Sequence, residues 1–241
     1  MTLKSLYSQA EFPEKIFVGL FQQNCFEETC TTGVLQSGAI EETGTDVNCY
    51  DVFCESKEGI ASGACVDNRV RLFNVNESES LGPYMARYFG AKFYRGEEFY
   101  LQIDSHSEFV SQWDTKLIHM ISKAPAEKPV ISTYPPGADG RWQDSVGNKI
   151  CDSSFAASQI EWQIVRLDPS QHIAGRPSEP VYAPFVAAGF FFSRGQFLHD
   201  VPFDPLLPWI FMVRYCYYYY YYYFRIKKYN KLVFYSLWCI G

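Results

Sequence analysis

Asp104 and His106 are the two side chains whose types and spacing most favour metal chemistry. They directly follow residues 99–103, an apolar run with the pattern of a β-strand. Because ligands of open α/β sheets bind where strands end, both side chains are expected at a ligand site. A carboxylate oxygen and an imidazole nitrogen suit Mn²⁺ or a similar ion, which neutralises the phosphates of a nucleoside diphosphate. Asp and Ser also favour ordinary turns, so the surrounding sequence must decide between the two interpretations.

Alternating strands and helices are predicted to position these residues. A strand feeding a helix is the βα unit, and its repetition indicates an α/β sheet with mostly parallel order. A Gly-rich dinucleotide loop and a P-loop are both missing from the sequence. Strands are predicted at residues 16–21, 69–75, 99–103, 129–134, 159–167 and 185–193, and helices at 80–94 and 113–121.

Residues 22–67 form a long insertion without clear periodicity, expected to lie on the surface with a short helix or two. Five cysteines fall within it (Cys25, Cys30, Cys49, Cys54 and Cys65). Since the N-terminus resembles no secretory signal, these cysteines are expected to be reduced thiols of a cytoplasmic protein. A disulfide-linked or zinc-bound insertion is the alternative, although the spacings are not those of a zinc knuckle.

Composition limits the partners and the number of domains. A chain of 241 residues that is 47% apolar can bury one good core, so one domain is expected. There are 21 basic and 27 acidic residues, giving a net charge of −6, and the first 200 residues contain no basic stripe with interleaved aromatics. Nucleic acid is therefore excluded as the expected partner. No apolar run reaches the ~20 residues of a membrane span, so no membrane partner is expected.

The last 29 residues differ from the rest of the sequence. Residues 213–241 contain seven consecutive tyrosines (217–223), five basic residues and no acidic residue. Such a run has neither helical nor alternating core periodicity and favours aggregation when exposed. The domain is therefore expected to occupy residues 1–212, and residues 213–241 are interpreted as an aberrant tail, such as a translated intron or a gene-model error.

Four ordered blocks resemble the cytoplasmic UDP-GlcNAc:hydroxyproline polypeptide N-acetylglucosaminyltransferases and, more distantly, the polypeptide N-acetylgalactosaminyltransferases. The resemblance covers residues 14–211, and an ordered set of blocks is more specific than any single motif. The blocks are residues 16–24 (IFVGLFQQN), residues 69–71 (RVR) with 82–87 (GPYMAR), residues 100–106 (YLQIDSH), and residues 187–193 (AAGFFFS) with 201–208 (VPFDPLLP).

The resemblance implies a GT-A type, Rossmann-like fold that binds UDP-GlcNAc and Mn²⁺. The reaction implied is transfer of N-acetylglucosamine, with retention, to a hydroxyl of hydroxyproline, Ser or Thr in a protein acceptor. Asp104 and His106 would be the metal ligands. The residues implied to bind the nucleotide sugar are Phe21, Asn24, Arg69, Arg71, Arg87, Asp104 and Gly189, the arginines through charge-assisted hydrogen bonds unless they are solvated surface charges. Asp104 and His106 are expected to face a cleft lined by residues 17–21, Arg87 and Gly189.

Two alternatives compete with the enzyme. In the family, the loop that ends here at Met212 continues into a Gly-Glu-Glu motif with acidic groups near the reacting sugar, and this sequence lacks that motif beyond Met212. The fold is therefore expected to be incomplete at its C-terminus, and the catalytic residues are unassigned. One alternative is an inactive fragment or a module that only binds UDP and a metal. The other is a secreted recognition protein held together by oxidised cysteines.

Overall fold

The computed structural model describes residues 1–27, 31–34, 40–43, 45–133, 148–149, 153–155, 165–167, 171–172 and 186–209. Met212, the predicted end of the domain, and the predicted tail, residues 213–241, lie outside this range. So do most of the predicted strand 159–167 and most of the loop that follows it. The boundary at Met212 and the incomplete C-terminus of the fold therefore stay predictions. None of the described helices is long and apolar enough to cross a membrane.

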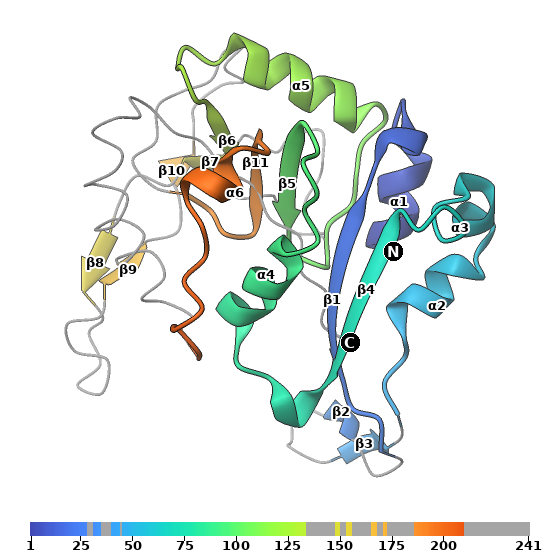
Figure 1. The fold of residues 1–241 in the computed structure, drawn as a ribbon. Helices are drawn as coiled ribbons and strands as arrows, with labels where there is room; N and C mark the ends of the chain where they lie inside the picture. The colour runs from blue at the N-terminus through green and yellow to red at the C-terminus, as the bar shows by residue number, and fades with distance from the viewer. Residues whose placement is uncertain are drawn as a thin grey trace.

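Helices and strands are both spread along the described parts of the chain (Figure 1). The N-terminal half contains α1 (Thr2–Ser8), η1 (Pro13–Lys15), β1 (Val18–Asn24), β2 (Thr31–Val34), β3 (Ile40–Thr43), α2 (Cys49–Cys54), α3 (Lys57–Ser62), β4 (Val70–Asn76) and η2 (Glu77–Glu79). The rest contains α4 (Pro83–Ala91), β5 (Phe99–Ile103), α5 (Trp113–Lys123), β6 (Val130–Ser132), β7 (Asn148–Lys149), β8 (Ser153–Phe155), β9 (Val165–Leu167), β10 (Gln171–His172), β11 (Phe190–Arg194) and α6 (Phe197–Asp200). The predicted α/β class is confirmed.

Two sheets make up the centre of the described structure. β1 and β4 pair in parallel, with Val18 opposite Val70 and Asn24 opposite Asn76. β11 lies between β5 and β6 and runs antiparallel to both. The prediction of a mostly parallel sheet is therefore wrong. Alternation of strands and helices predicts parallel neighbours, but it does not reveal where the last strand inserts, and β11 enters between two strands that precede it.

The strand predicted at residues 16–21 begins two residues later and ends three residues later in the structure. β1 continues through Gln22, Gln23 and Asn24. Gln22 and Asn24 are buried, yet both find polar partners, because the Gln22 amide donates to Asn48 and the Asn24 amide donates to the Val47 carbonyl. Burial of hydrogen-bonded amides thus extends a strand beyond its apolar run.

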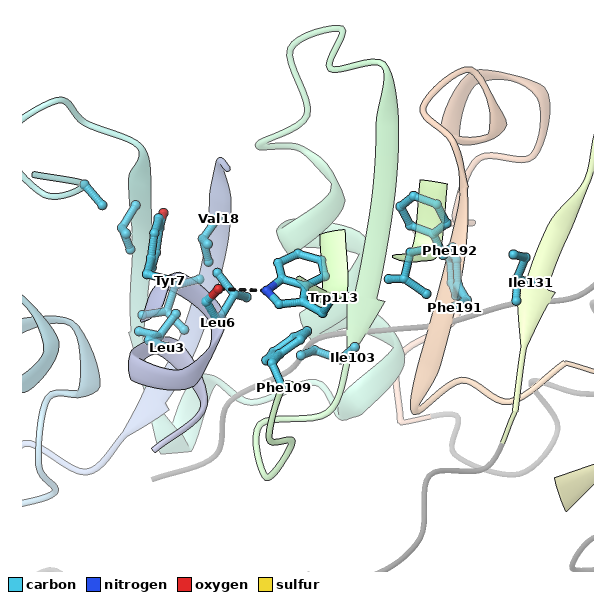
Figure 2. Packing of buried hydrophobic residues seen from close by; sticks show 14 of the residues in the cluster. Leu3, Leu6, Tyr7, Val18, Ile103, Phe109, Trp113, Ile131, Phe191 and Phe192 are labelled. Atoms are coloured by element: carbon cyan, nitrogen blue, oxygen red, sulfur yellow. Dashed lines mark hydrogen bonds between the residues drawn. The ribbon is translucent and has the colours of Figure 1, made fainter. Parts of the chain in front are cut away.

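One hydrophobic core joins the two sheets (Figure 2). Trp113, at the start of α5, lies between Leu6 of α1 on one side and Ile103 of β5 on the other. Its indole N–H donates to the Leu6 carbonyl at 2.8 Å, and its ring contacts Phe109 with centroids 4.6 Å apart. A buried indole needs such a partner for its polar N–H. This single side chain therefore connects the N-terminal helix to the second sheet.

Helices α4 and α5 follow from local sequence signals. α4 begins at Pro83, whose fixed φ suits the first helical turn, after Gly82 with φ +86°. α5 buries Trp113, Leu117 and Ile121, spaced four residues apart, so one stripe of the helix faces the core.

The predicted insertion contains the paired strands β2 and β3 and the two short helices α2 and α3. Cys54, at the end of α2, forms a disulfide with Cys65 across 11 residues, with their Cα atoms 5.8 Å apart. Cys25 is also disulfide-bonded. The expectation of reduced thiols is therefore wrong for these cysteines. Without a recognised signal sequence the thiols were predicted to be reduced, but the turn after α3 brings Cys65 back beside α2.

We expect Cys54 and Cys65 to resist alkylation in the denatured protein until a reductant is added, and peptide mass spectrometry will show this. Removing the bond in a Cys54→Ala/Cys65→Ala variant should lower the free energy of unfolding by about 2–4 kcal/mol, because the unfolded chain gains freedom. Val66→Ala, at a position 91% exposed in the same segment, is the matched control and should change it by less than about 0.5 kcal/mol. Alkylation of both cysteines without reductant would contradict the disulfide.

Candidate functional site

A partly buried ion pair between Arg87 and Asp104 lies at the carboxyl end of β5. Arg87, on α4, donates from Nη2 to Asp104 Oδ1 at 2.9 Å. The arginine side chain is 6% exposed, while the aspartate side chain is 30% exposed. The carboxylate therefore faces both the protein and the solvent, as a ligand-binding carboxylate must.

Gly189 supplies the space that the Asp104 carboxylate occupies. A Cβ atom at this glycine would lie 2.6 Å from Asp104 Oδ2, closer than atoms in contact can approach. The Asp104 N–H also donates to the Gly189 carbonyl at 3.0 Å. Residues predicted from two separate blocks of the sequence are thus brought together with Arg87 at one point.

Hydrogen bonds from and to hydroxyl groups stabilise the turn after β5. Ser107 Oγ donates to the Asp104 carbonyl at 2.9 Å, and Thr2 Oγ1 donates to the Ser105 carbonyl. The Phe109 N–H donates to Ser5 Oγ at 3.4 Å. His106 lies in this turn and is exposed. α1 therefore holds the turn that carries the two predicted metal ligands.

The donor set partly fits a divalent metal ion. Asp104 and His106 offer an oxygen and a nitrogen, the ligand types that Mn²⁺ accepts. Within the described residues, no group of three His, Cys, Asp or Glu side chains is placed to hold an ion. These two residues would therefore need water, substrate phosphate or another part of the chain to complete the coordination.

Arg87 has hydrogen-bonding capacity beyond the Asp104 pair. Its Nε and Nη1 atoms are buried, and neither has a hydrogen-bond partner among the described residues. A buried donor left unpaired costs about 1–3 kcal/mol, and more when it is charged. A protein can tolerate this cost where a bound ligand supplies the missing partner. The ligand that a guanidinium binds best is an anion.

The start of α4 is fixed by residues 203–209. The Asp204 N–H donates to the Tyr84 hydroxyl at 2.6 Å, and the Tyr84 ring packs edge-on against Phe203. The Trp209 N–H donates to the Leu81 carbonyl at 2.7 Å. The second and fourth sequence blocks are therefore in direct contact, and together they orient the helix that carries Arg87.

Two other predicted nucleotide-site residues lie on β1. Phe21 is buried and stacks on Phe89 of α4, with centroids 5.5 Å apart, and meets Phe73 edge-on. Asn24 is 1% exposed, and its Oδ1 has no hydrogen-bond partner in the part of the chain that the structure describes. Phe21 thus anchors α4 to the sheet, while Asn24 retains an acceptor at the carboxyl end of β1.

Arg69, directly before β4, and Arg71, within β4, have different partners. Arg69 donates to the carbonyls of Pro13 and Ser62 and pairs with Asp67 at 3.3 Å, so its donors serve the N-terminal segment. Arg71 donates from Nη1 to the Phe93 carbonyl at 2.6 Å and pairs with Glu97 at 3.2 Å. Neither of these contacts involves Asp104. Their roles in nucleotide binding stay predictions.

A cavity of ≈ 470 Å³ lies between the two sheets. Phe17, Val18, Gly19 and Arg87 line it, as predicted for the cleft, but Asp104, His106 and Gly189 are not among its lining residues. The predicted single cleft therefore does not correspond to this cavity. Arg87 lines the cavity and also pairs with Asp104.

Residues 1–214 match the family model described as Glycosyltransferase (GlcNAc). The chain belongs to this family. No curated protein matches the chain. The predicted resemblance to a glycosyltransferase family is confirmed at this level, and the domain is a transferase.

The C-terminal limit of the match lies close to the predicted end of the domain. The matched residues include Met212 and end at Arg214, whereas the domain was predicted to end at Met212. The acidic motif that the resemblance places beyond Met212 does not occur in residues 213–241, and Met212 itself lies outside the described residues. The catalytic acidic groups of this transferase therefore stay unassigned.

Sequence reasoning missed part of the support for this transferase site. Tyr100 donates its hydroxyl to Gln102 Oε1 at 3.1 Å, and the Gln102 amide donates to the Ala188 carbonyl at 3.5 Å. Burial raises the pKa of Tyr100, although the Arg87 charge opposes this effect, so the hydroxyl stays protonated as a donor. The spacing of Tyr100 and Gln102 could have predicted this contact, because residues two apart in a strand share a face. Both residues lie within the block 100–106, which was interpreted only as a whole.

Gly189→Ala should lower the free energy of unfolding of this transferase by about 1–3 kcal/mol, because the new methyl group displaces the Asp104 carboxylate from Arg87. Gly90→Ala is the matched control, since a Cβ atom there meets nothing within 4 Å. Being within α4, it should raise the free energy of unfolding by about 0.5–1 kcal/mol. Urea unfolding will measure both, and equal effects of the two substitutions would show that the carboxylate does not depend on Gly189.

Proposed function

We propose that this glycosyltransferase transfers N-acetylglucosamine from UDP-GlcNAc to a hydroxyl group of a protein acceptor. In this proposal the domain is of GT-A type and the reaction is metal-dependent and retaining, with hydroxyproline, Ser or Thr as the acceptor residue. The family description supports the sugar, since it names GlcNAc. The resemblance of the sequence blocks supports the nucleotide and the acceptor.

The single observation that carries the proposal is the buried Arg87 guanidinium beside Asp104. Loss of UDP leaves negative charge on the diphosphate as the bond to the sugar breaks. Positioned, desolvated cationic donors stabilise such charge more strongly than water does. Arg87 offers two buried donors without partners, next to a carboxylate at the end of a strand. A diphosphate oxygen would satisfy them with charge-assisted hydrogen bonds.

Asp104 and His106 would hold the divalent ion, which when bound supplies further positive charge at the diphosphate. The chain's own residues then have separate tasks. Arg87 orients Asp104 from one side, and Gly189 leaves the room that this orientation needs. Ser107 and Thr2 fix the turn, so His106 projects from a defined backbone. Precise positioning of this kind is what a transferring site requires.

One structural observation bears on the cellular location. The family type that the sequence resembles is cytoplasmic, and we propose the same location here. Disulfides, however, form and persist mainly in oxidising compartments, and the Cys54–Cys65 bond is of that kind. The oxidation state of this pair in the purified native protein therefore bears directly on the compartment.

We expect Mn²⁺-dependent release of UDP from UDP-GlcNAc, and we expect Asp104→Ala to reduce its rate by about 10²–10³-fold because charge stabilisation is lost. Asp200→Ala is the matched control, since it removes a carboxylate that pairs with Lys128 at 2.7 Å, away from the site. A coupled assay for UDP, with and without a hydroxyproline-containing or Ser/Thr-containing peptide, measures both variants.

Two results would contradict the proposal. Equal rates for Asp104→Ala and wild type would remove Asp104 from the reaction. Binding of UDP and Mn²⁺ without any release of sugar, by a protein shown to be folded, would favour the alternative in which the chain is a binding module only.

A further inference from the structure

The cavity between the two sheets lies apart from the Asp104 end of β5. Its walls come from the first residues of β1, from β4, from the C-terminal half of α4 and from the length of β5. Asp114 and Trp113 of α5 form another side. Arg87 is the residue that the cavity and the Asp104 site share.

The cavity walls are rich in aromatic rings. Flat aromatic faces favour ligands that are themselves flat and apolar, through stacking and edge-to-face contacts. A volume of ≈ 470 Å³ falls within the range of small-molecule pockets, about 300–1,000 Å³. The aromatic lining residues are Phe12, Phe17, Phe93, Tyr94, Phe99, Tyr100, Trp113 and Phe192.

Two cationic lining residues keep buried donors without partners. Arg71 is 9% exposed, and its Nε atom is buried with no hydrogen-bond partner from any described residue. Arg87 has two such atoms, Nε and Nη1. Buried guanidinium donors without partners favour an anionic group at this wall.

The acidic lining residues are already engaged. Asp114 accepts the N–H groups of Glu11 and Phe12, each at 2.9 Å, and Glu98 pairs with Arg194. Glu97 pairs with Arg71. Burial alone would raise the pKa of Glu97, but hydrogen bonds from backbone N–H groups and from Arg71 outweigh it and lower the pKa. The carboxylates therefore have their partners, whereas the two guanidinium groups have donors to spare.

We propose that the inter-sheet cavity is a second ligand site, which takes a small aromatic monoanion such as an aromatic carboxylate or sulfonate. The apolar body lies among the aromatic rings, and the anionic group accepts a hydrogen bond from the Nε–H of Arg71. The site is distinct from the proposed nucleotide site. It does not depend on the proposed function, because the cavity and its donors exist whatever reaction the chain performs.

The probe for this site is 8-anilinonaphthalene-1-sulfonate, an aromatic monoanion whose fluorescence rises in apolar surroundings. We expect the full native chain to bind one equivalent. Gly90→Leu should weaken binding about tenfold, because Gly90 lines the cavity and the added side chain fills part of it. Gly90→Ala is the control, because its single methyl group leaves most of the space and should change the affinity by less than about twofold. Circular dichroism confirms that each variant is folded.

The charge is tested separately from the shape. N-phenyl-1-naphthylamine has the same aromatic body without the sulfonate. Arg71→Gln should weaken binding of the sulfonate about tenfold and leave binding of the neutral probe within about twofold. Equal losses for both probes would overturn the anion assignment, and equal binding by Gly90→Leu and Gly90→Ala would place the probe elsewhere. Displacement of the probe by UDP with Mn²⁺ in simple one-to-one competition would show that the cavity is the nucleotide site and not a second one.

Discussion

The need to pair a buried guanidinium governs the arrangement around Arg87. A charge removed from water is tolerated only when it is hydrogen-bonded and neutralised, and breaking a buried pair costs about 3–5 kcal/mol. Arg87 is 6% exposed, and its ion-pair partner is Asp104. The Asp104 carboxylate reaches Arg87 only if β5 ends at residue 103, if Gly189 leaves room for the carboxylate and if α4 is fixed in position. Each of these requirements is met by a different segment of the chain.

The rest of the fold supplies these requirements through packing. Phe21 stacks on Phe89 and so attaches α4 to β1, while Tyr84 and the segment around Phe203 fix the other end of the helix. Trp113 links α1 to the core shared by both sheets, and α1 in turn holds the turn after β5 through Thr2. The connection explains why residues at the very start of the chain matter for a site more than 100 positions later. It also leaves a cavity between the sheets, where the same arginine forms part of the wall.

The sequence predicted the neighbours of Asp104 better than it predicted the sheet. Asp104 could be placed at the end of a strand from the local pattern of residues 99–103 alone. The blocks that contain Arg87 and Gly189 could be assigned to the same site because their residue types and order are specific. Strand order could not be predicted, since the insertion of β11 between β5 and β6 depends on contacts far apart in the chain. The disulfide was predicted only as the alternative, because the thiols were judged by the expected compartment, whereas the fold brings Cys54 and Cys65 together through the turn after α3. Arg69 illustrates a further limit, because a sequence motif does not reveal that Pro13 and Ser62 use its donors.

The central claim is that the unpartnered donors of Arg87 receive the diphosphate of the nucleotide. Nuclear magnetic resonance of arginine side chains tests it most directly, by following the Nε–H signal of Arg87, assigned with an Arg87→Lys variant, during titration with UDP and diamagnetic Mg²⁺. The account predicts that this signal shifts and that its exchange with water slows as UDP binds, because Nε gains an anionic partner. Binding of UDP with no change in the Arg87 signal would contradict the account.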